Sequence, residues 1–520
     1  MGNTMAKYKK FSYSQSLFIP VIFNEQIIQG TFEHALNHII DNEIDLSIFD
    51  GRFKNDETGA PAYSPGILLK IVLYAYSLGI IHSRKIAKCC ETNITFMALS
   101  ADTRPHFTTI ANFISSLETE VTDIFLKVLL TCDSKNLIGK NMFAIDGCKL
   151  SSNCSKEWSG TRAGFKKKKE KIEKSIKFIL DKHKYTDSDE SFTQDMFEKE
   201  EKALESLSRK AEKIQEWLDE NDDKKGTTGK PIQSNIIDND SAKLVSSHGV
   251  VQGFNGVNVA DDKHQVIVSA EAFGSSAETR QLTQLIDQTR KNFFSIGDKE
   301  DIFKESVFLA DSGFHSETNM KALFKAEIDA YVADNKFRKR NPDFKNAQEY
   351  KKRSIDRKGT VKAKKYFQPS DFSYDQKKEK LICPAGNEMY IRNRNYKTYR
   401  GLKGIVYQGK KTDCRVCSLK KKCMRKERTE HRQVAIFTNK LSELKGSYTT
   451  KMIEKFDSAK GRHLYSRRMG LIEPVFANIR NMLGLDRFTL RGKQKVNTQW
   501  KLYCIVHNIG KIAKYSNLAA

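Results

Sequence analysis

The chain has 520 residues, too many for one ordinary domain, and 39% of them are hydrophobic, which is enough for a substantial core. Its formal net charge of +25 favours a polyanionic partner. The longest apolar tract, residues 67–81, contains a lysine and is too short to span a bilayer, and the N-terminus lacks the apolar core of a signal peptide. We therefore expect a cytoplasmic protein directed to nucleic acid and exclude a membrane protein.

The N-terminal residues 1–135 are expected to form a helical domain. Pro65 suits the first turn of a helix, and the residues that follow it are apolar at helical spacing. Further short helical patterns carry arginines and lysines at positions expected to be exposed. This organisation fits a DNA-binding helix-turn-helix and a plain helical bundle equally well.

Residues 166–228 contain two charged helical patterns separated by a polar loop. Each has an apolar face, formed by Ile172, Ile176 and Ile179 in the first and by Leu204, Leu207, Ala211, Ile214 and Leu218 in the second. The second set repeats at the 3-4 spacing of a short heptad seam. We expect an antiparallel helical hairpin inserted into a larger domain, with its charges forming a solvated face.

Residues 136–165 and 229–335 interleave strand and helix patterns, which indicates a mixed α/β domain. Two of the strand patterns end in an acid, at Asp146 and at Asp311. Carboxylates at the carboxyl ends of neighbouring strands could share Mg²⁺. An aspartate at a strand end is more often a turn or helix cap, and Asp311, which is followed by Ser-Gly, suits that role as well.

Residues 336–430 form a basic segment with four grouped cysteines. Its first part, residues 336–365, has 13 lysines and arginines against 3 acids, and we expect it to lie along phosphates. The first cysteine stands in C-P-A-G and is separated by 30 residues from a C-x2-C-x5-C group: Cys383, Cys414, Cys417 and Cys423. Four thiolates satisfy a tetrahedral Zn²⁺. The alternative is four reduced cysteines that share no metal, like the six cysteines elsewhere in the chain.

Residues 431–520 are expected to add C-terminal helices to the α/β domain. Glu473 precedes Pro474, and that pair suits the first turn of a helix. A two-metal phosphoryl-transfer site needs a third acid from an element beside the strand ends, and Glu473 is the candidate. Tyr465 and Arg468 lie upstream of it, and Arg480 lies two turns along the same helical face. A carboxylate beside phosphate-binding cations is the composition expected of a nucleic-acid phosphotransfer site.

These motifs, in this order, resemble those of the DDE transposases of bacterial insertion sequences. The matching stretches are FAIDGCKLSSNCSKEWSGT (143–161), FLADSGFHS (308–316) and YSRRMGLIEPVFANIR (465–480). The N-terminal helical run and the tail at 488–512 are also similar to such proteins. The resemblance extends over most of the chain, and the helical hairpin is its least typical part.

The resemblance implies an RNase H-like catalytic core with an all-α N-terminal domain. In such a core Asp146, Asp311 and Glu473 would bind Mg²⁺ or Mn²⁺. The implied activity is cleavage of the element's ends and strand transfer into target DNA, by a homodimer bound to double-stranded DNA at the bacterial nucleoid. Related transposases carry a similar cysteine cluster between the second aspartate and the glutamate, which supports structural zinc.

The resemblance also maps the family's tyrosine–arginine–glutamate–lysine signature onto Tyr465, Arg468, Glu473 and position 480. Arg480 replaces the lysine, which keeps the charge and allows bidentate phosphate binding. Four residues instead of the usual three separate Arg468 from Glu473, so Arg467 stays open as the alternative.

Two other functions remain open at this point. One is a non-catalytic DNA-binding protein derived from a transposase, and the other is a nuclease that cuts DNA without joining it. The presence of all three acids favours a catalytic protein over the first alternative. The sequence has no glycine-rich NTPase loop, which agrees with a reaction that needs no ATP.

Overall fold

The computed structural model divides the chain into two compact units. Unit 1 comprises Met1–Leu137, Met482–Gly484 and Ile505–Ala520, and unit 2 comprises Ile138–Asn481 and Leu485–Cys504. The structure describes residues 21–52, 61–186, 194–226, 229, 231–246, 249–275, 281–341, 366–375, 380–398, 403–426, 428–437 and 447–516. Within these ranges no helix has the length and apolar character needed to cross a membrane.

The N-terminal part of unit 1 is helical, as predicted. Its α-helices are α1 (Phe32–His38), α2 (Pro65–Ser77), α3 (Ser83–Thr92), α4 (Ile94–Ser100), α5 (Phe107–Ser115) and α6 (Val121–Ser134). Helix α2 begins at Pro65, whose missing N–H is not needed in the first turn. Most of α2 is buried, so it forms the centre of this helical packing. The side chain of Asn93 accepts hydrogen bonds from two N–H groups at the start of α4 and fixes where that helix begins.

A mixed β-sheet forms the centre of unit 2. Its strands are β1 (Met142–Ser151), β4 (Ala242–Ser246), β5 (Gly249–Asp261), β6 (Ile267–Phe273), β7 (Val307–Ala310) and β8 (Asp329–Val332). Their order is β4-β5-β1-β7-β8, and β6 pairs with the second half of β5. Strand β1 is antiparallel to β5 but parallel to β7, and β7 is parallel to β8. The mixed α/β class predicted from the sequence is confirmed.

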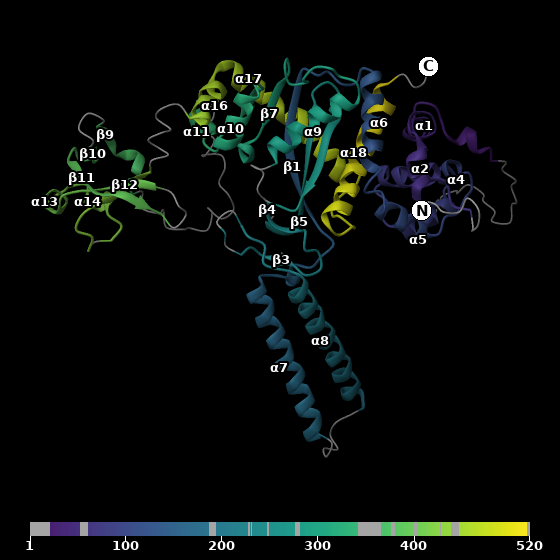
Figure 1. Ribbon diagram of the computed structural model, residues 1–520, viewed down its shortest axis with the longest axis horizontal. Helices are drawn as coiled ribbons and strands as arrows, with labels where there is room; N and C mark the ends of the chain where they lie inside the picture. The colour runs from purple at the N-terminus through teal and green to yellow at the C-terminus, as the bar shows by residue number, and fades with distance from the viewer. Residues whose placement is uncertain are drawn as a thin grey trace, which may run out of the picture. The chain divides into compact units, whose positions relative to one another are not determined.

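Helices pack on this sheet and connect its strands (Figure 1). Helix α9 (Leu282–Ser295) lies between β6 and β7 in the chain, and α10 (Glu317–Lys325) joins the parallel strands β7 and β8. The C-terminal helices are α16 (Tyr448–Asp457), α17 (Ala459–Ala477) and α18 (Lys493–Tyr515). Helix α17 contacts β1, β5, β7 and β8. On α18, Trp500 packs against Gly256 of β5 so closely that a Cβ there would lie 2.7 Å from the indole ring.

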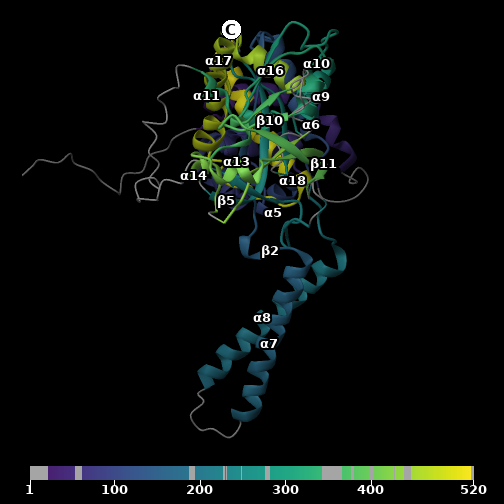
Figure 2. The same cartoon turned by 90° about the vertical axis from the view of Figure 1, so that its left-hand side faces the viewer.

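The segment between β1 and β4 forms the predicted helical hairpin. Helices α7 (Arg162–Thr186) and α8 (Gln194–Glu220) lie side by side in both views of the molecule (Figures 1 and 2). The short strands β2 (Ser159–Gly160) and β3 (Ser234–Asn235) pair at its base. Phe165, Ile214, Trp217 and Leu218 form a small separate core there. The hairpin therefore has its own packing at the point where it joins the sheet domain.

The cysteine-containing segment forms a second, antiparallel sheet, where the sequence indicated a basic, loop-rich region. Its strands are β9 (Ser373–Asp375), β10 (Lys380–Ile382), β11 (Glu388–Lys397), β12 (Lys403–Gln408) and β13 (Gln433–Phe437), in the order β13-β12-β11-β10-β9. The short helices α13 (Lys411–Arg415) and α14 (Lys420–Cys423) follow β12. Phe372, Leu381, Met389, Tyr407 and Val434 form the core of this cysteine module. Most of the predicted phosphate-binding stretch, residues 342–365, lies outside the described residues.

Candidate active site

The two candidate aspartates lie on neighbouring parallel strands. The prediction that a strand ends at Asp146 is wrong, because β1 continues to Ser151 and Asp146 pairs with Asn258 of the antiparallel strand β5. Strand β7, in contrast, ends at Ala310. The last matched pair between the parallel strands is Ile145 with Ala310, so Asp146 and Asp311 follow it together. The sheet register therefore places both carboxylate-bearing residues next to each other.

Asp311 also acts as a cap. Its Oδ1 accepts a hydrogen bond of 3.0 Å from the N–H of Gly313, at the start of the short 3₁₀ helix Ser312–Phe314. The turn-cap role that the sequence left open is therefore real, and it holds the side chain beside β1. A carboxylate has capacity for further ligands after one hydrogen bond of this kind, so the cap does not exclude metal binding.

Glu473 lies in the interior of α17, not at the start of a helix as the sequence suggested. The helix begins at Ala459, where the Ser458 side chain accepts a hydrogen bond from Gly461, so Pro474 falls near its end. Proline has no N–H and leaves the carbonyl four residues earlier without its helical donor. That carbonyl belongs to Gly470, and the side-chain amide of Gln265, in the turn after β5, donates to it at 3.0 Å.

A wider helical turn follows Pro474. The backbone forms a π-helical turn at Asn478–Met482 directly after α17, a feature that is often found at functional sites. Arg480 lies in this π-helical turn. The sequence predicted a regular α-helix at this position.

Asp146 and Glu473 line one groove of about 470 Å³, which we call the first groove. Arg480 and Cys148 line it as well. Burial raises the pKa of the Cys148 thiol to about 11, and the neighbouring Arg480 guanidinium opposes this shift. A cation and two acids that come from distant parts of the sequence therefore share one open groove.

Arg468 is the arginine that contacts the acids. Its guanidinium lies 2.7 Å from the Asp146 carboxylate, and its side chain is only 8% exposed against 24% for Asp146. Arg467 instead pairs with Asp262 at 3.2 Å and is half exposed. Of the two arginines that the sequence left open, Arg468 is thus the one beside the first aspartate, although its spacing to Glu473 is one residue longer than in the family signature.

Tyr465 lies next to the same acids. Burial raises the pKa of the Tyr465 hydroxyl, and the charges of Asp311 and Asp146 add to this rise, whereas the Arg468 guanidinium opposes it. Tyr465 and Arg468 also line one groove together. Arg468 and Tyr465 therefore lie on the side of the paired aspartates, while Glu473 and Arg480 share the first groove with Asp146.

The side chains are not drawn together around a common metal position. Among the residues that the structure describes, no three histidine, cysteine, aspartate or glutamate side chains are arranged to hold a metal ion. Asp146 is engaged by Arg468, and Asp311 caps a turn. The chemistry of the donors nevertheless fits Mg²⁺ or Mn²⁺, because carboxylate oxygens are the ligands that these cations prefer. In this structure Arg468 therefore occupies one carboxylate oxygen of Asp146.

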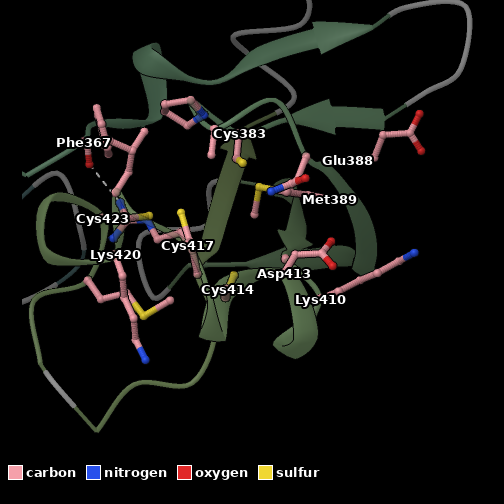
Figure 3. Close-up of a pocket in the computed structure, with 17 residues that line it drawn as sticks. Phe367, Cys383, Glu388, Met389, Lys410, Asp413, Cys414, Cys417, Lys420 and Cys423 are labelled. Atoms are coloured by element: carbon pink, nitrogen blue, oxygen red, sulfur yellow. Dashed lines mark hydrogen bonds between the residues drawn. The ribbon is translucent and has the colours of Figure 1, made fainter.

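The four grouped cysteines surround one small cavity of about 30 Å³ in the cysteine module (Figure 3). Cys383 follows β10, Cys414 lies in α13, Cys417 lies before α14, and Cys423 is the last residue of α14. Burial raises the pKa of the Cys423 thiol, and the other three sulfurs act in the same direction while Arg432 opposes it. Four thiols around one space suit Zn²⁺ as donors, although among the described residues no three cysteines are arranged to hold a metal ion.

The sequence did not reveal every residue around the site. It missed Gln265 and Arg462 and gave Arg338 only as part of the basic segment 336–365, and the fold places all three on or beside α17. Arg462 stands three residues before Tyr465 and thus on the same helical face, and that spacing was available as a signal. Gln265 lies in a turn and Arg338 in the short helix α11 (Phe337–Arg340), both far from α17 in sequence, so only the tertiary structure relates them to it.

Two segments of the chain match known protein families. Residues 382–513 match the Transposase DDE domain, and residues 21–116 match the Transposase domain (DUF772). The first match contains Glu473 and all four grouped cysteines, whereas Asp146 and Asp311 lie outside both matched segments. Neither curated proteins nor solved structures give a match.

Proposed function

We propose that this chain, which belongs to the DDE transposases of insertion sequences, cuts DNA at the ends of its own element and joins the freed strands to target DNA. Double-stranded DNA is both substrate and partner, and pairing of two ends makes a homodimer the expected active form. A charge of +25 supports binding to a polyanion of this kind.

The observation that carries this proposal is the register of β1 and β7. It sets Asp146 and Asp311 side by side after the pair of Ile145 with Ala310, and Glu473 shares the first groove with Asp146. The strand order β6-β5-β1-β7-β8, with three antiparallel strands followed by two parallel ones, supports an RNase H-like core. We propose these three acids as the catalytic ligands of Mg²⁺ or Mn²⁺.

In the proposed first step, a water oxygen attacks the phosphorus at the element's end. The bond from phosphorus to the 3′ oxygen breaks, the attacking water gives up a proton to solvent, and the leaving oxygen takes one up, so a 3′-hydroxyl and a 5′-phosphate result. Bound Mg²⁺ would lower the pKa of the attacking oxygen and stabilise the negative charge on the leaving one. The carboxylates supply the oxygen ligands, while Arg480 in the first groove holds a phosphate.

In this proposal Arg468 also controls when the Asp146 carboxylate can bind a metal. Its guanidinium balances the charge of Asp146 before metal and DNA arrive. A DNA phosphate offers the same guanidinium an alternative bidentate partner. Arrival of DNA would therefore release Asp146 for the metal, and Tyr465 beside it would support the same phosphate.

Substitution of the acids tests the catalytic assignment. The substrate is a duplex that carries the inverted repeat found in the DNA flanking the coding sequence, incubated with Mg²⁺ or Mn²⁺. Asp146→Asn and Glu473→Gln should each abolish detectable cleavage, while gel-shift binding of the duplex stays largely intact. Glu454→Gln, which changes an exposed acid on α16, is the matched control and should cut normally. Normal cleavage by either active-site variant would overturn the assignment.

The same assay decides between the alternatives. A protein that binds the repeat without cutting it would be a non-catalytic derivative, and one that cuts without joining would be a nuclease. Size measurement of the protein bound to a repeat duplex checks the homodimer.

We further propose that Cys383, Cys414, Cys417 and Cys423 bind one structural Zn²⁺. The cavity that the four thiols share supports this assignment, since tetrahedral zinc takes four thiolates. Elemental analysis of the purified protein should find about one zinc per chain. Protein that is folded but lacks zinc would contradict the proposal.

A further inference from the structure

Glu473 also borders a second groove, of about 450 Å³, of whose other residues the cleavage step proposed above uses Arg468 and Tyr465 alone. This second groove lies between α11 (Phe337–Arg340), α16 and α17. Its lining includes three aromatic residues and three arginines: Phe337, Phe456, Tyr465, Arg338, Arg462 and Arg468. Glu473 thus lines both the first and the second groove.

The aromatic residues form one connected cluster. The Tyr465 ring packs edge-to-face on Phe456, with centroids 4.8 Å apart, and on Phe337, with centroids 5.5 Å apart. The Arg338 guanidinium lies 5.5 Å from the Phe337 ring centroid. Aromatic surfaces bordered by guanidinium groups are suited to DNA strands, because bases and sugars pack on the rings and phosphates bind the cations.

Two arginines of this groove have donors that nothing in the described structure satisfies. The Nε atoms of Arg462 and Arg468 are buried, and neither has a hydrogen-bond partner among the described residues. The Arg468 residue is 6% exposed. A buried N–H without an acceptor is unfavourable, so two arginines that line the groove keep hydrogen-bonding capacity that the described residues do not use.

Two acids, Glu473 and Asp457, line this groove against its three arginines. Asp457 lines the second groove, but its carboxylate accepts a hydrogen bond of 2.5 Å from Arg340 Nε, on α11. Its charge is therefore balanced by a neighbour, and the groove keeps an excess of positive charge. An anionic ligand fits this surface better than a cation does.

We propose that the second groove binds a phosphate of the target strand, while the first groove holds the strand of the element. The inference rests on the proposed function, because strand transfer brings two DNA strands to one set of acids. In that step the element's 3′ oxygen forms a bond to the target phosphorus and loses its proton to solvent. The bond from that phosphorus to the target's 3′ oxygen breaks, and the leaving oxygen takes up a proton.

The same backbone chemistry is present in the uncut strand of the element's own end. Both candidate ligands are DNA phosphates, so contacts alone do not separate them. They differ in the step that each would serve, since the element's own strand is needed for cleavage and a target strand only for joining. Separate assays of the two steps therefore distinguish the two sources.

The test uses the full-length protein and two substrates. One is the intact repeat duplex, which reports cleavage. The other is a pre-cleaved repeat duplex with a free 3′-hydroxyl, supplied with a supercoiled plasmid as target, which reports joining. Arg462→Ala and Arg338→Ala should cut within about twofold of the wild type but join about tenfold or more slowly, the loss expected for a charge-assisted hydrogen bond to phosphate. Higher plasmid concentration should restore part of the joining rate.

Lys460→Ala is the matched control. Lys460 lies on α17, is exposed, and lines neither groove, so its loss removes one positive charge from the same helix without touching the proposed contacts. Circular dichroism melting checks that all variants fold, and Arg462→Lys should recover more joining than Arg462→Ala. Equal loss of cleavage and joining would assign the groove to the element's own strand and overturn the proposal, as would joining at the wild-type rate. Failure of the wild type to cut would instead disprove the proposed function.

Discussion

The central sheet and the cysteine module both gather candidate metal ligands, but they do so over very different distances in the chain. The three acids come from β1, the end of β7 and α17, so their meeting depends on the register and packing of all of unit 2. The four cysteines lie within residues 383–423 and surround a cavity in a module whose core has five buried residues among those that the structure describes. A large core can hold its site without metal, whereas in a small module the proposed zinc would supply much of the stability.

Removal of zinc should therefore have the largest structural effect in the molecule. With a strong chelator, or with Cys414→Ser, we expect the cysteine module to unfold, because structural zinc supplies about 10 kcal/mol or more to sites of this kind. Limited proteolysis followed by mass spectrometry should show new cuts within residues 366–437, while the central sheet stays protected. Withdrawal of Mg²⁺ serves as the control and should stop cleavage of DNA with no change in the digestion pattern.

The expected difference between the two regions would be wrong if the cysteine module stays protected from proteolysis after zinc is removed. In that case its five-residue core would suffice alone, and the four thiols would be ordinary reduced cysteines. The same digestion, with and without chelator, separates these outcomes.

A smaller effect on stability is expected at the ion pair between Arg468, on α17, and Asp146, on β1. Arg468→Ala removes the partner of Asp146 and leaves a largely buried carboxylate without its cation. We expect a loss of about 1–3 kcal/mol in the free energy of unfolding. Arg467→Ala, which breaks a half-exposed pair with Asp262, should cost at most about 1 kcal/mol. Urea denaturation of both variants measures the difference.

The Arg468→Ala variant also tests whether Arg468 competes with a metal ion for Asp146. If this arginine holds the place of a metal, then Mn²⁺ added without DNA should stabilise Arg468→Ala more than the wild type, because Asp146 no longer has to leave a partner. Thermal melting at increasing Mn²⁺ concentration measures this. An equal shift in both proteins would mean that the ion pair does not compete with the metal.

The sequence predicted the elements whose patterns are local. Apolar runs identified β1, β7 and the helices that follow them, and residue types identified the acids and cysteines. The sheet of the cysteine module was missed because β11, with sequence EMYIRNRNYK, is mostly exposed and charged, so it lacks the alternation of a half-buried strand. Its pairing partners are set by contacts that no short window contains.

Asp146 and Glu473 show why the geometry of the site could not be predicted in full. The apolar run before Asp146 indicated a strand but not its end, because the continuation to Ser151 is stabilised by pairing with β5, about 100 residues later in the chain. The proline after Glu473 indicated a helix start, because local rules exclude proline from helix interiors. In the folded protein a side chain more than 200 residues away in sequence, that of Gln265, makes the interior position tolerable.

The hydrogen bond from the Gln265 side chain to the Gly470 carbonyl predicts the smallest change in stability, and the most specific one. Gln265→Ala leaves the Gly470 carbonyl without its side-chain donor, which should cost about 0.5–1 kcal/mol in the free energy of unfolding, since the site is exposed to water. In a Pro474→Ala background the helical N–H returns and satisfies that carbonyl, so the same Gln265→Ala change should cost close to nothing. A double-mutant cycle by urea denaturation measures the difference. Equal costs in both backgrounds would show that Gln265 supports the helix in some way unrelated to the proline that follows Glu473.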